Sequence, residues 1–130
     1  MKLDLNIILR ECCSYYEQDI EDVKSKSRLS ELIEVRQMYC YLAKVRHYHK
    51  CKPTGDLINR DHSSVVHSAK VIENQFSINN KKVREDYIAI VRRMELDDIN
   101  LKIVMAQQRI EKRKRENKRD ADLIAELSIY

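Results

Sequence analysis

Residues 60–67 read Arg60-Asp61-His62-Ser63-Ser64-Val65-Val66-His67, and this stretch decides the fold. Asp61 is suited to cap a helix, because its carboxylate can accept hydrogen bonds from the free N–H groups of the first turn. Upstream, residues 50–55 contain the one proline and the one glycine of the chain and interrupt any helical pattern, and a brief segment follows at 56–59. The stretch therefore predicts a helix, a sharp turn and a second helix, which is a helix-turn-helix. Apolar residues recur at helical spacing along the second helix: Val65, Val66, Ala69, Ile72 and Phe76.

Further helices are expected on both sides of this motif. The long core helix should be capped by Ser30 and run to about His47. Shorter helices are expected at 4–16, capped by Asp4 or Asn6, and at 19–25, before a polar loop at 24–28. Another helix should open at Ser77 or Asn79. The core helix carries an apolar stripe of Leu32, Ile33, Val35, Met38, Tyr39, Leu42, Ala43 and Val45.

Residues 1–95 are accordingly expected to form one domain, and residues 96–130 a helical extension. A single glycine and a single proline among 130 residues leave few tight turns or hairpins. The fold class predicted is all-α, a helix bundle containing a helix-turn-helix, with a long C-terminal helical extension.

Composition also limits the chemistry. Phosphate-binding loops need several glycines at fixed offsets, so no bound nucleotide is expected. The sequence has no paired carboxylates, nucleophile elbow or HExxH helix, and we expect neither catalysis nor a cofactor. No apolar run approaches the roughly 18 residues of a membrane span, no signal peptide leads the chain, and the four cysteines form no CxxC pair. These features predict a cytoplasmic protein with reduced thiols and no membrane partner.

Several strings, in the right order, resemble the C-terminal DNA-binding domain of the bacterial replication initiator DnaA. The strongest is the stretch at 60–67, which is similar to that family's RDH(T/S)(T/S)V-x-H signature at the start of its recognition helix. A second runs from Arg36-Gln37 to Lys44 and resembles the family's central helix, and Tyr15-Tyr16 and the loop at 25–28 also fall at family-like spacings. The resemblance covers about residues 5–94 and implies a domain that binds double-stranded DNA.

The first arm of the motif departs from the family pattern. Where the family has Leu-Pro-x-Ile-Gly and a Gly-Gly turn, this chain has Lys52-Pro53-Thr54-Gly55 and Ile58-Asn59, with one residue fewer. The turn is therefore less permissive, and we expect the recognition helix to sit at a somewhat different angle.

The resemblance implies two groups of DNA contacts. Bases would be read by Arg28 in the minor groove, where narrow A/T tracts attract guanidinium groups, and by Asp61, His62 and Ser63 in the major groove. Specificity at the base facing Ser63 is expected to be relaxed, because serine lacks the methyl group that threonine offers to thymine. Phosphates, which fix register without being read, would be contacted by Arg36, Gln37, Lys44, Lys52, Arg60, Ser64 and His67.

The same residues have plainer explanations when the resemblance is set aside. Asp61 would only cap its helix, ahead of a solvated first turn. Arg28 would be a solvated loop residue, and Arg36 a surface residue paired with Glu34 or another carboxylate. His67 would be structural.

Two other clusters have alternative interpretations. Cys40, His47, His49 and Cys51 combine thiols and imidazoles, which are zinc ligands, but the two histidines lie on different helix faces and no metal is expected. The basic run at 112–115 could contact phosphates. Acidic residues interleave with this run, which favours an exposed helix with ion pairs, and the net charge of +4 is modest.

The segment after residue 95 carries the pattern of a coiled-coil seam. Two clean heptads are fewer than the three or four that identify a coiled coil, and the alternative is that this helix folds back on its own domain. We expect a homodimer through the C-terminal helix. The seam residues are Leu96, Ile99, Ile103, Ala106 and Ile110.

The sequence thus predicts a sequence-specific binder of DnaA-box-like sites, acting on the nucleoid as a replication or transcription regulator, with a phage, plasmid or other mobile element as its expected source. The rival hypothesis is a non-enzymatic interaction module that binds a host replication factor through the same fold or the C-terminal helix. A pure protein-binding descendant would have no physical reason to retain Arg28 together with residues 60–64.

Overall fold

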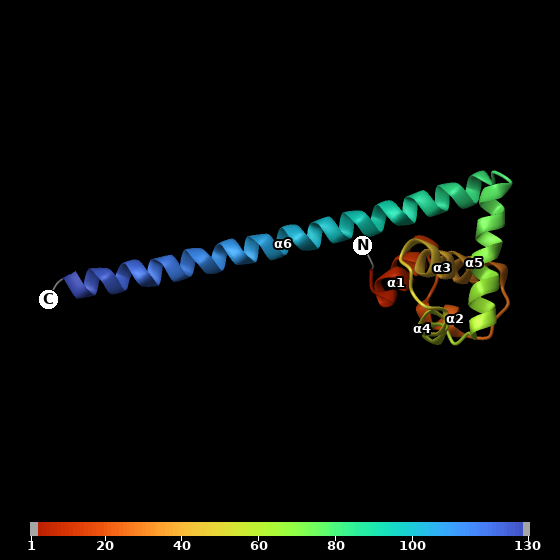
Figure 1. The fold of residues 1–130 in the computed structure, drawn as a ribbon, viewed down its shortest axis with the longest axis horizontal. Coiled ribbons are helices and arrows are strands. Elements are labelled where there is room, and N and C mark those ends of the chain that lie inside the picture. Colours follow the sequence, from red (N-terminus) through yellow and green to blue (C-terminus); the bar gives the residue numbers. More distant parts are fainter. Residues whose placement is uncertain (1–2, 129–130) are drawn as a thin grey trace. The chain divides into compact units, whose positions relative to one another are not determined.

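The computed structural model describes residues 3–128 of the chain, and the side chains of residues 3–119. This part is all-α, with no strand among the described residues, as predicted (Figure 1). No helix within it is apolar over a sufficient length to cross a membrane. The elements are α1 (Leu5–Tyr15), α2 (Ile20–Lys24), α3 (Ser30–Tyr41), a π-helical turn η1 (Leu42–Arg46), α4 (Cys51–Leu57), α5 (His62–Ser77) and α6 (Lys81–Ser128).

Three helices begin where an aspartate can cap them. Asp4 accepts a hydrogen bond from the N–H of Asn6 at 2.7 Å, and Asp19 accepts one from the N–H of Glu21 at 2.9 Å. Asp61 caps α5 in the same way. Each cap satisfies a donor that has no partner inside its helix, which explains why these helix starts could be predicted. The prediction that Ser30 caps α3 is wrong, because Ser30 is the first residue of the helix, the cap position is Leu29, and no side chain caps it.

Two segments differ from the expectation. The core helix is α-helical only to Tyr41, after which the chain widens into η1, and the N–H of His47 donates to the carbonyl of Leu42 at 3.0 Å. Residues 50–55 were expected to interrupt the helical pattern, but most of them belong to α4. Pro53 is tolerated there because it lies in the first turn, where a backbone N–H would have no helical acceptor.

The core of the first compact unit, which ends at Met94, is organised around α3. Tyr39 is fully buried, and its hydroxyl donates to the carbonyl of Thr54 in α4 at 2.9 Å. This bond satisfies the one polar atom of an otherwise apolar side chain. The buried apolar residues of α3, η1 and α5 are Leu32, Val35, Met38, Tyr39, Cys40, Leu42, Ala43, Val65, Ala69 and Ile72.

The first turns of α6 belong to this unit. Tyr15, the last residue of α1, and Tyr16, which follows it, donate to the two carboxylate oxygens of Asp86, at 2.8 and 3.2 Å. Asp86 is itself buried, and Lys82 bridges it to Glu34 of α3. The core therefore extends beyond the helix-turn-helix into the next helix.

The second unit begins at Glu95. From Glu95 to Arg119 nearly every side chain is exposed. The seam residues Leu96, Ile99, Ile103 and Ile110 are 58%, 52%, 49% and 51% exposed.

Candidate nucleic-acid interface

The helix-turn-helix is formed by α4, a turn at 58–61, and α5. Asn59 has φ 56°, a left-handed conformation that asparagine tolerates better than most residues. It thus supplies the positive φ that a glycine would supply in this turn. The N–H of Arg60 donates to the carbonyl of Gly55 at 2.8 Å. The backbones approach so closely that a Cβ at Gly55 would lie 2.4 Å from the Arg60 carbonyl oxygen. The turn chemistry thus differs from a Gly-Gly turn, yet the two helices are tightly joined.

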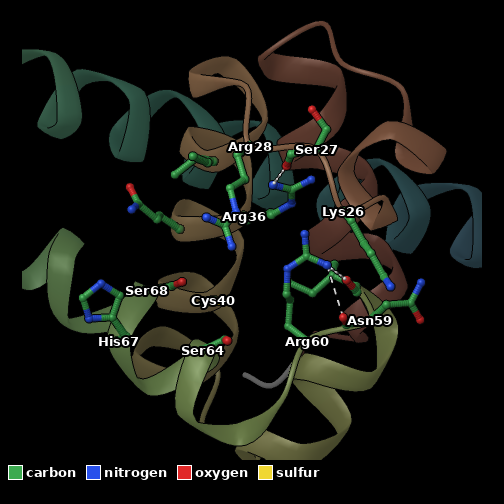
Figure 2. Close-up of a pocket in the computed structure, with 13 residues that line it drawn as sticks. Lys26, Ser27, Arg28, Arg36, Cys40, Asn59, Arg60, Ser64, His67 and Ser68 are labelled. Carbon is green, nitrogen blue, oxygen red and sulfur yellow. Dashed lines mark hydrogen bonds between the residues drawn. The ribbon is translucent and has the colours of Figure 1, made fainter.

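A cavity of about 840 Å³ opens between the loop before α3, α3 itself and the start of α5 (Figure 2). Four of its lining residues are basic, and none of the thirteen described residues that line it is a carboxylate. Figure 2 shows that Arg28, Arg36 and Arg60 come from three separate segments and meet here. Besides its burial, the charge of Arg60 lowers the pKa of Arg36, and an anion bound in the cavity would relieve this repulsion. The basic residues are Lys26, Arg28, Arg36 and Arg60.

The cavity gathers about half of the residues predicted to contact DNA. Those that line it are Arg28, Arg36, Gln37, Arg60, Ser64 and His67. Asp61, His62 and Ser63 lie beside it, exposed at the first turn of α5. Lys44 is half-buried in η1, and Lys52 is exposed on α4. None of these placements tests a contact with DNA, so the assigned roles stay predictions.

Asp61 has the geometry of a cap. Its Oδ1 accepts from the N–H of Ser64 at 2.8 Å. Hydrogen bonds from the backbone and the side chain of Ser64 hold the pKa of Asp61 below its ordinary value of 3.8. The carboxylate is fully exposed, so capping and base reading are compatible in one side chain.

Arg36 lies in a different environment from the one expected of a surface residue. It is 6% exposed, and its guanidinium donates to the carbonyls of Asp22, Val23, Ser25 and Ser27. The alternative in which Arg36 pairs with Glu34 at the surface is wrong, because Glu34 accepts from Lys82 instead. Burial, and secondarily the charge of Arg60, lower the pKa of Arg36 from its ordinary value.

Seven of the thirteen lining residues were not predicted as site residues, among them Lys26, Asn59 and Ser68. Lys26 lies two positions before Arg28 in the same polar loop, and Ser68 lies one helical turn after Ser64, so loop charge and helical periodicity could have identified both. Asn59 carried no such signal, because its place depends on how the turn folds.

Cys40 also lines this cavity, as a core residue. Burial raises the pKa of its thiol to about 12. A metal ligand would have to be the thiolate, so this environment opposes the zinc alternative.

Comparison with known proteins gives one matching family. The bacterial DnaA protein helix-turn-helix matches residues 5–72, which is more than half of the chain. The match includes the loop that carries Arg28, all of α3 and the start of α5.

Individual relatives are similar over the same region. The chromosomal replication initiator protein DnaA of Chlorobaculum tepidum is 34% identical over 88 residues, which are 65% of this chain and 18% of that protein. The DnaA of Bacteroides thetaiotaomicron is 31% identical over 72 residues, 55% of this chain and 15% of that protein. The DnaA of Desulfatibacillum aliphaticivorans is 28% identical over 93 residues, 72% of this chain and 20% of that protein. The chain thus spans a fifth or less of the length of these relatives.

Proposed function

Because the chain belongs to the helix-turn-helix family of bacterial DnaA proteins, a DNA-binding and non-catalytic module, we propose that it reads a short, specific, DnaA-box-like duplex sequence. The single observation that carries this proposal is the cavity. The loop of Arg28 and the first turn of α5 both line it. Its lining residues include four basic side chains and no carboxylate among those described. With such a surface, the loop of Arg28 and the start of α5 could enter two adjacent grooves of DNA, while the phosphate backbone between the grooves lies against the basic cavity.

In this mode of binding, α5 enters the major groove with its N-terminal end. Asp61, His62 and Ser63 are exposed there and carry an acceptor, an imidazole and a hydroxyl for base edges. Arg28, exposed in its loop, enters the neighbouring minor groove, where a narrow A/T tract concentrates negative potential. The helix N-terminus adds a favourable partial charge toward phosphate.

The process that this binding serves is proposed to be the control of replication or transcription, with the protein acting on the nucleoid. The activity of a whole initiator protein is not part of the proposal, because the similarity covers a fifth or less of those relatives. A regulator of this kind would act by occupying a site.

The test is selection of a duplex from a random library, followed by fluorescence anisotropy with the selected and a scrambled duplex. We expect at least about a thousandfold preference for the selected duplex, with affinity that falls steeply as salt rises because phosphate contacts release counterions. Equal affinity for both duplexes, or no binding at low salt, would rule out a specific reader.

Two substitutions separate reading from positioning. His62→Ala should reduce discrimination by about 1 to 3 kcal/mol, since a base contact is lost. Lys44→Ala should weaken all duplexes alike, since a phosphate contact carries no sequence information. If circular dichroism shows intact helices and His62→Ala discriminates like the wild type, α5 does not read bases through its first turn.

We also propose that two copies associate through the α6 seam at 96–110. Four of its five residues are branched aliphatic side chains, each about half exposed. A seam of this kind is stable in water when a second helix covers it. A dimer would present two recognition helices and favour paired half-sites.

A further inference from the structure

The loop between α2 and α3 carries Arg28 but has almost nothing apolar to hold it in place. Residues 25–28 are Ser, Lys, Ser and Arg, and the next residue, Leu29, is 62% exposed. α2 is only five residues long, and the last carbonyls of any helix lack donors within it. Something else must fix this segment.

Arg36 supplies most of that restraint from α3. Its Nε donates to the carbonyl of Val23 at 2.7 Å, and its Nη1 donates to the carbonyl of Ser27 at 2.6 Å. Its Nη2 donates to the carbonyls of Asp22 and Ser25 at 3.2 and 3.0 Å. Four of the five guanidinium N–H groups are therefore directed at carbonyls of α2 and of the loop that follows it, and a single one is left for any phosphate.

Arg60, in the turn before α5, binds the same loop. Its Nη2 donates to the carbonyl of Ser25 at 2.6 Å, so that this one oxygen accepts from both arginines. Its Nη1 donates to the carbonyls of Ile58 and Asn59 in the turn. Asn59 adds a bond from its Nδ2 to the carbonyl of Lys24 at 3.3 Å.

We propose that Arg36 and Arg60 are positioning residues, a guanidinium clamp that holds the Arg28 loop in register with the first turn of α5. Ser27, bound by Arg36, directly precedes Arg28, and Arg60 directly precedes Asp61, which caps α5. The minor-groove and the major-groove readers are thereby joined through two buried or half-buried guanidinium groups. This inference rests on the proposed function and gives these two arginines a task other than the phosphate contact predicted from the sequence.

The clamp works by preorganisation. A loop that is ordered before binding loses less conformational entropy when Arg28 enters a groove, so that more of the contact energy is available for affinity. A lysine in place of either arginine would keep the charge but lose the planar fork, and so could not satisfy several carbonyls at once. Arginine-to-lysine variants therefore separate positioning from simple attraction to phosphate.

The first test needs no DNA. Hydrogen exchange of residues 24–30 is measured in the full chain for the wild type, Arg60→Lys, Arg36→Lys and a control, Arg92→Lys, on the exposed face of α6. We expect exchange in this loop to accelerate by about tenfold in the two clamp variants, because each loses at least one charge-assisted hydrogen bond, and to stay unchanged in the control. Arg60 is half-exposed, so Arg60→Lys remains informative if Arg36→Lys does not fold. Unchanged exchange in Arg60→Lys overturns the clamp.

The second test is a double-mutant cycle on the selected duplex. Arg28→Ala should lower affinity about tenfold in the wild type, but only about twofold in the Arg60→Lys background, since an unclamped Arg28 contributes little. Substitution of the bases that Arg28 contacts should no longer change the affinity of Arg60→Lys, while discrimination through His62 persists. General destabilisation of the domain would reduce both kinds of discrimination together.

The outcomes are distinguishable. Faster exchange together with non-additive affinities supports the clamp, and additive affinities overturn its role in reading. If no duplex is bound specifically, the proposed function fails, and the exchange measurement still decides whether the two arginines hold the loop.

Discussion

Asp61 stands at the junction between the turn and α5, where one carboxylate can both cap a helix and face a base. The N–H of Ser64 occupies Oδ1, while the side chain remains fully exposed. Arg36 is the opposite case, a cation that is almost completely buried and bound by backbone carbonyls. At this scale, exposure and hydrogen-bond partners, rather than residue type, decide what a side chain can do.

Asp61→Asn separates the two tasks of this residue. Asparagine caps helices as well as aspartate does, so Asp61→Asn should remain about as stable as the wild type at neutral pH, and Asp61→Ala should be less stable. If Asp61 also accepts from a cytosine N4 group, both variants lose discrimination at that base. Urea unfolding and anisotropy measured on the same samples check this, and unchanged discrimination in the Asp61→Asn variant would leave Asp61 as a cap alone.

The pH dependence of stability should also report on Asp61. Its pKa is lowered in the folded state, so its contribution is fully present above the unfolded value of about 3.8 and is lost as the pH falls through the lower folded value. In urea titrations from pH 7 downward, the wild type should lose stability relative to Asp61→Asn only in this acidic window. Parallel curves for the two proteins would contradict the assignment.

Gly55 is required by the close approach of α4 to the turn. In Gly55→Ala the new Cβ would lie 2.4 Å from the Arg60 carbonyl oxygen and 3.0 Å from Val65 Cγ2. The first of these contacts is with the backbone, which cannot move aside as easily as a flexible side chain. We expect a loss of about 1 to 3 kcal/mol in the free energy of unfolding, as for other overpacked sites. The control Asp56→Ala, at the exposed neighbouring position, should change it by less than about 0.5 kcal/mol. Equal stability of the two variants in urea unfolding would show that the turn can shift.

At the scale of elements, α6 takes part in two kinds of environment. Its first turns are joined to α1 by the hydrogen bond from Tyr15 to Asp86 and to α3 by the ion pair between Lys82 and Glu34. They also bury Ile90 and Met94. Beyond Glu95 its described side chains are almost all exposed. The family match ends at residue 72, before α6 begins, yet the first unit depends on this helix for part of its core.

Two isoleucines of α6 test this dependence. Ile90 is fully buried and Ile88 is 46% exposed. Ile90→Ala should cost about 2 to 5 kcal/mol, because it leaves a cavity in the core, and Ile88→Ala should cost less than about 1 kcal/mol. Thermal or urea unfolding of both variants measures the difference. Similar small losses would mean that α6 is only loosely attached to the first unit.

At the scale of the whole molecule, the proposed dimer would cover the seam at 96–110. Sedimentation equilibrium of the full chain should give a dimer at tens of micromolar, and a chain ending at Glu95 should be monomeric. Ile103→Glu should shift the full chain toward monomer, because it buries a charge in the seam, whereas Gln107→Glu, outside the seam, should not. A monomeric full chain would reject the dimer, and a dimeric truncated chain would move the interface into the first 95 residues.

The all-α class, the helix-turn-helix and the starts of α1, α2 and α5 could be predicted from the sequence, because caps and apolar periodicity act within a few residues. The sequence also indicated the family through strings that remain contiguous in the chain. It did not predict the bounds of α4 or the presence of η1, whose form depends on packing, such as the bond from Tyr39 to Thr54. The burial of Arg36, and the place of Arg28, Arg36 and Arg60 around one cavity, became evident only from the folded chain. The bond between Arg60 and Ser25 spans 35 residues, and contacts of that separation arise from the fold of the whole unit rather than from any local pattern.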